Sequence, residues 1–235
     1  MMLQGSGSLT ILGPAVAVLL GWIAGGAFGL YPFGDEGAVL PATLTAVSGR
    51  AFVRGLIAPS LLFTPVVGVV TLVSALVGSY GLLSAIALTL IGCFLTVVGA
   101  ALAPMIGMWF PRYSAIRIGN SDEVRPPRLP AGVLHVVLVW LPGAALVGLV
   151  AAPELVRLAL SGIGYVPGFI LESIANGGVL TTFASSLNDT GATIQGLPLT
   201  AFRSGFGGLL IVAGLLVARR AYPGALRRFE THELH

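Results

Sequence analysis

The chain has 235 residues, of which 56% are hydrophobic and 9% are charged, and its formal net charge at pH 7 is +3. Soluble domains carry about a quarter of their residues as charged side chains, so this composition excludes an ordinary soluble protein. The apolar residues form long continuous runs, which exclude the alternating pattern of a membrane β-barrel. We therefore predict an all-α, polytopic helical membrane protein whose residues 1–235 form a single transmembrane domain.

All twelve basic residues are arginines. A P-loop needs a lysine on the nucleotide phosphates, and a Schiff base needs a lysine amine, so both kinds of chemistry are excluded for this chain. Any ATP hydrolysis must then come from a partner. The positive charge is typical of loop arginines beside a membrane, so we expect contact with membrane lipid and no nucleic-acid partner.

The first apolar run covers residues 9–30, about the length that one bilayer crossing requires. Small residues recur within it at every fourth position, which places them on one ridge of a helix: Gly13, Ala17, Gly21, Gly25 and Gly29. Such a ridge lets a second helix approach closely, so we assign Gly13, Gly21, Gly25 and Gly29 to helix packing. Random scatter in a glycine-rich protein remains the alternative.

The second segment, residues 34–55, holds the first four charges of the chain: Asp35 and Glu36 at its start, and Arg50 and Arg54 at its end. Between them, apolar residues fall on one helical face at Leu40, Leu44, Val47 and Ala51. The acidic pair precedes a helix N-terminus, where the helix dipole favours negative charge. We predict an interfacial helix over about 36–54, with Ser48 and Gly49 capping the next helix. An ordered loop is the alternative.

Further spans follow in chain order. Residues 56–77 and 82–108 are joined by a four-residue turn, which predicts an antiparallel hairpin of spanning helices. A polar loop at 109–130 comes next, and residues 133–152 form another span. Residues 155–200 are apolar but interrupted by Gly164, Pro167, Gly168, Glu172, Gly177 and Gly178, so we predict short external re-entrant helices there. The last span covers residues 204–220.

Arginine-rich loops mark the cytoplasmic side of a membrane protein. Residues 34–55 hold two arginines, residues 109–130 hold four and the tail after residue 218 holds four, whereas the 78–81 turn holds none. Placing all three groups inside requires five spans, with the N-terminus outside and the C-terminus in the cytoplasm. The expected location is the cell membrane.

Short motifs along the chain, four of them within residues 34–55, resemble those of a known family. In order they are Asp-Glu-Gly at 35–37, Leu-Pro-x-x-Leu-Thr at 40–45, Ser-Gly-Arg at 48–50, Val-Arg-Gly at 53–55, Ala-Pro-x-x-Gly-x-x-Phe-Pro-Arg at 103–112 and Arg-Arg-Phe-Glu at 227–230. Together they resemble permease subunits of ABC transporters, in particular the exporter-type permeases of the diverged archaeal branch. That family has six spans, so five spans with an external N-terminus match its plan without the first helix.

The resemblance implies that the 34–55 helix is a coupling helix that docks on a separate ATPase subunit. The residues expected to face the ATPase are Asp35, Glu36, Leu40, Leu44, Arg50, Arg54, Arg112 and Arg117. A second permease copy or a paralogue is the other expected partner. No cofactor and no enzymatic activity of the chain itself is expected. The alternative is a non-transporting membrane scaffold or a truncated permease remnant.

The remaining polar residues give weaker signals. Glu172 and Asp189 are expected near the external interface, where solvated or capping roles are favoured over a functional one. The triplet that begins at Asn188 matches the glycosylation acceptor pattern, which is common by chance. His135 is expected to be a packing or interfacial residue rather than a ligand, and the single cysteine, Cys93, is expected to pack rather than to react. The sequence has no metal-ligand spacing and no common hydrolase motif.

Overall fold

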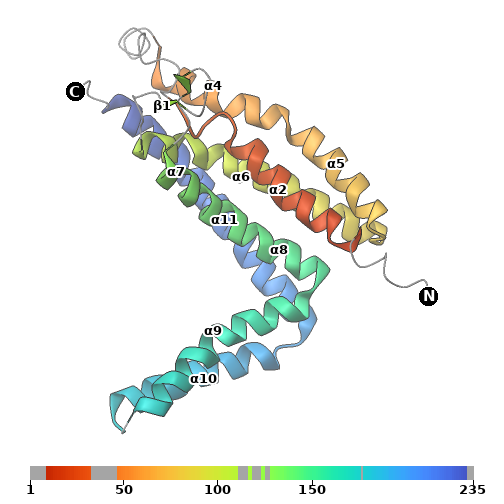
Figure 1. Ribbon diagram of the computed structural model, residues 1–235, viewed down its shortest axis with the longest axis vertical. Coiled ribbons are helices and arrows are strands. Elements are labelled where there is room, and N and C mark those ends of the chain that lie inside the picture. The colour runs from red at the N-terminus through yellow and green to blue at the C-terminus, as the bar shows by residue number, and fades with distance from the viewer. Residues whose placement is uncertain are drawn as a thin grey trace. The chain divides into compact units, whose positions relative to one another are not determined.

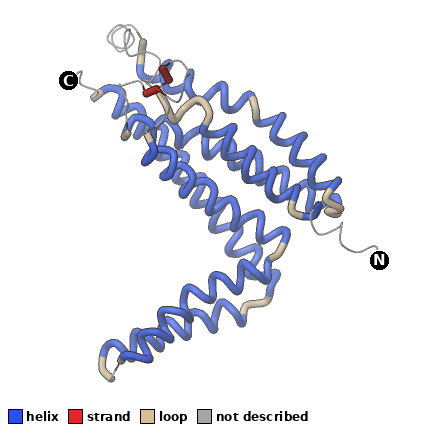
Figure 2. Tube along the Cα trace, viewed as in Figure 1, coloured by secondary structure: helices blue, strands red, loops and turns tan. Residues whose placement is uncertain are grey.

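A computed structural model describes residues 9–32, 47–110, 116–117, 123–124, 128–175 and 177–231. Helices make up nearly all of this part of the chain (Figure 2). Within it, five helical segments are long and apolar enough to cross a membrane: Gly49–Val77, Leu82–Trp109, Leu129–Ala151, Pro153–Ile174 and Leu199–Glu230. The prediction of an all-α, polytopic membrane protein is confirmed.

Figure 1 shows the described elements in chain order. They are α2 (Leu12–Gly26), α4 (Gly49–Leu62), α5 (Thr64–Val77), α6 (Leu82–Trp109), β1 (Ile116–Arg117), β2 (Glu123–Val124), α7 (Leu129–His135), the π-helix η1 (Val136–Trp140), α8 (Leu141–Ala151), α9 (Pro153–Ile174), α10 (Val179–Gly196) and α11 (Leu199–Glu230). β1 and β2 form a two-residue antiparallel pair.

The chain divides into two compact units. Unit 1 contains residues Met1–Val147 and Val212–His235, and unit 2 contains Gly148–Ile211. Helices α8 and α11 each begin in one unit and end in the other.

In unit 1, α2 lies against α6 along its glycine-rich face. A Cβ built on Gly21 would lie 2.8 Å from the carbonyl oxygen of Gly92, and a Cβ built on Gly25 would lie 2.9 Å from Cα of Gly99. Real Cβ atoms do not approach other atoms so closely, so only glycine fits at these two positions. The α2 ridge therefore sets how near the two backbones come, as small residues do at membrane helix contacts. Gly13 has a similar relation to Ala75 of α5, and Gly29 to Ala103 of α6.

The α5–α6 pair is an antiparallel hairpin, as the short connection predicts. Residues 78–81 close it through backbone bonds from Gly78 to Ser74 and from Tyr80 to Ala75. Ser79 has a φ of 64°, a left-handed conformation that reverses the chain here. A Cβ on Gly78 would lie 2.7 Å from the carbonyl oxygen of Leu9, so the start of the α2 segment lies beside this turn.

Helix α4 does not end where the predicted interfacial helix was expected to end. It begins at Gly49 and leads into α5 through Phe63, so Gly49–Val77 is one apolar helical segment of 29 residues. The expected boundary between an interfacial helix and a span at residues 54–56 therefore lies inside α4. Residues 33–46, which hold the rest of the expected interfacial helix, lie outside the described residues.

Helix bounds differ from the expected spans at both ends of the chain. Residues 9–30 contain a 15-residue α2, too short to count among the five long helices, because the chain turns after Gly26. The last helix is 32 residues long and extends well beyond both ends of the expected 204–220 span. The set of five long helices therefore includes α9 in place of α2.

In unit 1, helices α8 and α11 both contact the middle of α6. Gly143 of α8 lies against Leu95, and Gly214 of α11 lies against Phe94. Within unit 1, α8 runs antiparallel to α6, and α11 runs parallel to it.

Unit 2 is built on the α9–α10 pair. The two helices are antiparallel, and the turn between them contains Gly177 and Gly178, whose φ values are 97° and 79°. The expected interruptions at Gly164, Pro167 and Gly168 are absent, since all three residues lie inside the 22-residue α9. The prediction of short helices over residues 155–200 is therefore wrong in length. Gly164 and Gly168 instead face α10, where a Cβ on Gly164 would lie 2.7 Å from the carbonyl oxygen of Leu187.

Candidate docking surface

The described part of the predicted docking surface is the first two turns of α4. Ser48 precedes this helix in an extended conformation, and its Oγ accepts a hydrogen bond from the backbone N–H of Ala51 at 3.3 Å. This side chain satisfies one of the N–H groups that a helix start leaves unpaired, so the predicted capping by Ser48 is confirmed. Arg50 and Arg54 are both exposed and lie one turn apart on α4.

A hydrophobic cluster anchors this end of α4 to two other helices. We call it the basal cluster, and its buried members are Val53, Met108, Ala225 and Phe229. The rings of Phe52 and Phe229 stack with centroids 4.8 Å apart, and Phe229 also lies against Gly49. The cluster therefore joins the start of α4, the end of α6 and the end of α11.

The same end of unit 1 carries a group of exposed arginines. Figure 1 shows the start of α4, the start of α7 and the C-terminal end of α11 together at this end, opposite the α5–α6 turn. Its exposed arginines include Arg50, Arg54, Arg128, Arg227 and Arg228. Among the described residues the one ion pair is Arg157–Glu154 of α9, so the arginines of this end form no ion pair within the described part. They are available to an acidic surface.

The other predicted docking residues are only partly covered by the structure. Asp35, Glu36, Leu40, Leu44 and Arg112 lie outside the described residues. The backbone of Arg117 lies in β1, where it pairs with Glu123 of β2. The structure therefore brings Arg50 and Arg54 together and does not bear on the remaining six residues of the predicted surface.

No family model, curated protein or solved structure matches this chain.

His135 packs in the centre of unit 1, but its contacts with two other helices were not predicted from the sequence. His135 is fully buried at the end of α7, with its ring against Gly26 of α2 and its Nε2 3.2 Å from the carbonyl oxygen of Gly99 in α6. A carbonyl oxygen only accepts, so Nε2 carries the proton and Nδ1 is left as an acceptor. Within the described residues Nδ1 has no partner. Gly26 and Gly99 have no side chains, so they leave the space that the imidazole fills. Positions 26, 99 and 135 are too far apart in the sequence for a spacing pattern to predict this contact.

In unit 2, polar side chains link α9 to α10 and to the segment before α11. Arg157 is held by Oε2 of Glu154 at 2.6 Å and donates to the carbonyl oxygen of Leu197 at 2.9 Å. Closer to the turn between α9 and α10, Nδ2 of Asn188 donates a hydrogen bond to Oε2 of Glu172 at 3.1 Å. Glu172 thus has a role in joining two helices. Asn188 lies within α10 rather than in a loop, which disfavours it as a glycosylation acceptor.

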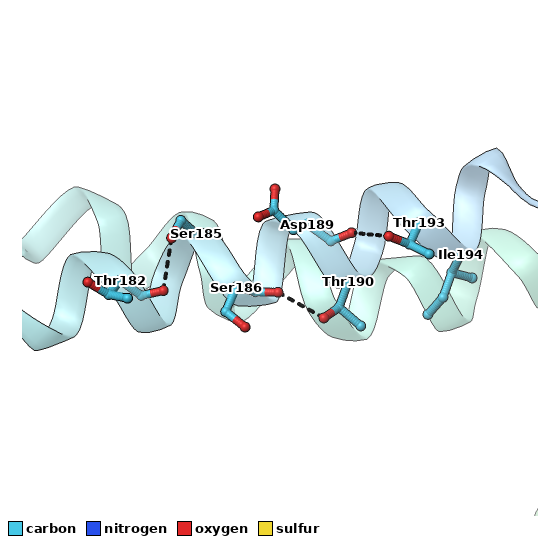
Figure 3. A pocket seen from close by; sticks show the side chains of 7 residues that line it. All are labelled: Thr182, Ser185, Ser186, Asp189, Thr190, Thr193 and Ile194. Carbon is cyan, nitrogen blue, oxygen red and sulfur yellow. Dashed lines mark hydrogen bonds between the residues drawn. The ribbon is translucent and has the colours of Figure 1, made fainter.

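One face of α10 is polar and exposed. It borders an open hollow of about 520 Å³ whose lining is Thr182, Ser185, Ser186, Asp189, Thr190, Thr193 and Ile194 (Figure 3). Four of its five hydroxyl groups bond to backbone carbonyls of the preceding turn; for example, Thr190 donates to the carbonyl of Ser186 and Thr193 to that of Asp189, each at 2.8 Å. Such internal bonds satisfy the hydroxyls without a ligand. No group of metal-ligating side chains occurs among the described residues.

Proposed function

We propose that this chain is the membrane-spanning permease subunit of an ATP-driven (ABC) transporter, and that a separate ATPase subunit supplies the energy for alternating access. The observation that carries the proposal is the basal cluster, which joins α4, α6 and α11 beside the exposed Arg50 and Arg54. A permease of this type needs a surface on which the ATPase docks. It also needs tight packing between that surface and the spanning helices, so that movement of the ATPase displaces them.

In unit 1 this packing begins at the capped first turn of α4. Val53 is fully buried against Met108 and Phe229, so α4 cannot shift without moving α6 and α11. Helix α4 also leads into α5 through Phe63, which carries displacement further along the same span. Packed interiors transmit such shifts because they are dense and barely compressible. A displacement applied at this end would therefore move four helices, α4, α5, α6 and α11.

The charge at this end favours the cytoplasmic side. Exposed arginines gather there, and the opposite end is formed by the arginine-free 78–81 turn and the start of the α2 segment. By the positive-inside rule the arginine-rich end faces the cytoplasm, so the N-terminus lies outside and the C-terminus lies inside the cell membrane. ATP is made in the cytoplasm, which is the compartment in which an ATPase partner must work.

The proposed ATPase-facing surface comprises Arg50 and Arg54 together with the sequence-predicted residues Asp35, Glu36, Leu40, Leu44, Arg112 and Arg117. The apolar residues would supply the centre of the contact and the charges its rim, as in other protein interfaces. A second permease copy or a paralogue would complete the transporter, because alternating access requires two halves around a central pathway.

A charge-reversal experiment tests the proposal. The wild-type chain, purified from its native membrane with bound partners, is expected to retain an ATPase that is identified by the lysine-containing P-loop in its sequence. Arg50→Glu with Arg54→Glu should lower the amount of this ATPase by tenfold or more, because two attractive rim charges become repulsive (about 1 kcal/mol for each of the two changes, at least). Leu44→Asp should lower it as well.

Arg203→Glu is the matched control, since Arg203 is an exposed arginine of α11 in unit 2. This variant should retain the ATPase, and all variants should insert into the membrane to the wild-type level. A wild-type chain that brings no P-loop ATPase with it, or equal recovery from the double variant, would contradict the proposal.

A further inference from the structure

A groove of about 370 Å³ lies between α2 and the α7–η1 segment of unit 1. Trp22 of α2 forms one side, and Val133, Val136 and Val137 form the other. The floor includes Gly132, where no described atom lies within 4 Å of a built Cβ, so the missing side chain leaves the groove open. Val136 and Val137 belong to η1, and π-helical turns are frequent at functional sites.

The walls of this groove face the surroundings of the protein. Val133 is 52% exposed and Val137 is 44% exposed, and both lie in Leu129–Ala151, a segment long and apolar enough to span a membrane. The exposed surface of such a segment meets lipid chains rather than water. A volume of about 370 Å³ is at the lower end of small-molecule sites, so the groove has room for part of one acyl chain.

One end of the groove carries a positive charge. Arg128 lines the groove, is exposed, and is the residue that immediately precedes α7 and the span. Among the described residues it forms no ion pair. A guanidinium group matches the geometry of a phosphate, and basic pockets beside spanning helices bind anionic headgroups.

An apolar groove with a cation at its mouth is complementary to an amphiphile with a negative head and a hydrocarbon tail. We infer that the α2–α7 groove binds an anionic glycerophospholipid, whose acyl chain lies between Trp22 and the valines of α7–η1 and whose phosphate pairs with Arg128. This site is formed by α2 and α7–η1 rather than by α4, although Arg128 lies at the same end of unit 1 as Arg50 and Arg54. Its occupation does not depend on an ATPase or on transport.

Trp22 provides a direct reporter of the bound chain. The full chain with Trp109→Phe and Trp140→Phe keeps Trp22 as its one tryptophan, because the sequence has three. It is reconstituted in two preparations of phosphatidylcholine vesicles. One preparation contains phosphatidylglycerol with brominated acyl chains, and the other contains the same fraction of phosphatidylcholine with brominated acyl chains. Bromine quenches tryptophan on contact, so quenching measures occupancy. The relative association constant should favour phosphatidylglycerol roughly fivefold, the preference expected from one arginine at a membrane surface.

Two variants separate the parts of the site. Arg128→Gln should reduce the preference for phosphatidylglycerol to about onefold while leaving quenching by phosphatidylcholine unchanged. Gly132→Leu should reduce quenching by both lipids, because the new side chain fills the groove without meeting described protein atoms. The matched controls are Arg219→Gln, at another exposed arginine, and Gly162→Leu, at a helical glycine of α9 whose built Cβ also meets nothing within 4 Å. Both controls should behave as the parent.

Four results would overturn the inference. Equal quenching by the two brominated lipids in the parent would remove the role of Arg128, as would a preference that survives Arg128→Gln. Wild-type quenching in Gly132→Leu would show that the chain does not enter the groove. A change of oligomeric state in Gly132→Leu, measured by size-exclusion chromatography with light scattering, would assign the groove to a second copy of this chain. Arg128→Gln alters an exposed side chain and keeps the test decisive if Gly132→Leu does not fold.

Discussion

The α2–α6 contact of unit 1 and the α9–α10 contact of unit 2 both depend on glycines, but they differ in what accepts the hydrogen bonds between helices. In unit 1 the acceptors are backbone carbonyls: Ser60 donates to Gly25 at 3.4 Å, Cys93 donates to Thr64 at 3.7 Å, and the ring of His135 lies 3.2 Å from the carbonyl of Gly99. In unit 2, side chains accept as well, since Ser161 donates to Gln195 at 3.1 Å and Asn188 to Glu172.

This difference follows from the number of helices at each contact. In unit 1, a glycine serves two purposes, because it allows a neighbouring backbone to approach and leaves its carbonyl uncovered for a third helix. Gly25 shows both, with α6 against its Cα and Ser60 of α4 on its oxygen. In unit 2, α9 pairs with α10 alone, so polar side chains along the two helices fix how they align. Loss of a glycine should therefore cost more in unit 1.

The largest effect is expected from Gly25→Leu. A Cβ at this position would lie 2.9 Å from Cα of Gly99, 3.0 Å from the carbonyl oxygen of Thr96 and 3.1 Å from the backbone nitrogen of Ala100. These are backbone atoms that cannot rotate away, so α2 must separate from α6. We expect a loss of about 3 kcal/mol or more and a fall in melting temperature of roughly 10 °C in detergent.

Gly55→Leu is the control for this prediction, because Gly55 of α4 is also helical and no described atom lies within 4 Å of its built Cβ. A melting temperature for Gly25→Leu within about 2 °C of this control would mean that the α2–α6 backbones are not in direct contact.

A smaller effect is expected from Gly164→Leu in unit 2. The added side chain would meet the carbonyl oxygen of Leu187 at 2.7 Å and the nitrogen of Gly191 at 3.0 Å, which forces α9 away from α10. A two-helix pair can open without moving a third helix, so we expect a loss of about 1–2 kcal/mol. Spin labels at Leu158 and Thr193, in a Cys93→Ala background, should move apart by about 2 Å.

Gly162→Leu serves as the control, since it adds the same side chain to α9 on a face where no described atom lies within 4 Å. If Gly164→Leu lowers the melting temperature as much as Gly25→Leu, the two contacts do not differ in the way proposed above.

The two glycine sets also differ in how readily the sequence reveals them. In α2, glycines or alanine recur at every fourth position of a charge-free run, so a packing ridge can be predicted from spacing alone. In α9, Gly164 and Gly168 flank Pro167, and this combination is typical of a break in a helix. The structure keeps all three inside one helix because α10 covers the glycine face. Tertiary contact thus decides whether a glycine breaks a helix or packs against another.

The predicted docking surface likewise has local features that the sequence predicts and contacts between distant segments that it does not. The cap at Ser48 is a local feature, and local hydrogen bonding made it predictable. The basal cluster joins Val53, Met108 and Phe229, which are widely separated in sequence, and no periodicity within one helix indicates such a contact. The groove beside Arg128 is also unpredictable from sequence, because it exists through the pairing of α2 with α7 and through the π-helical turn that follows α7.

The smallest effect is expected at the Asn188–Glu172 hydrogen bond, whose donor and acceptor are 3.1 Å apart. A double-mutant cycle of Asn188→Ala and Glu172→Ala, measured by denaturation in mixed micelles, should give a coupling free energy of about 0.5–1 kcal/mol, as for other side-chain hydrogen bonds in membrane proteins. Glu172→Gln should retain part of this coupling, because an amide oxygen can still accept from Asn188. A coupling of zero would mean that this hydrogen bond does not help to hold α9 to α10, and Ser161–Gln195 would be the remaining side-chain bond between the two helices.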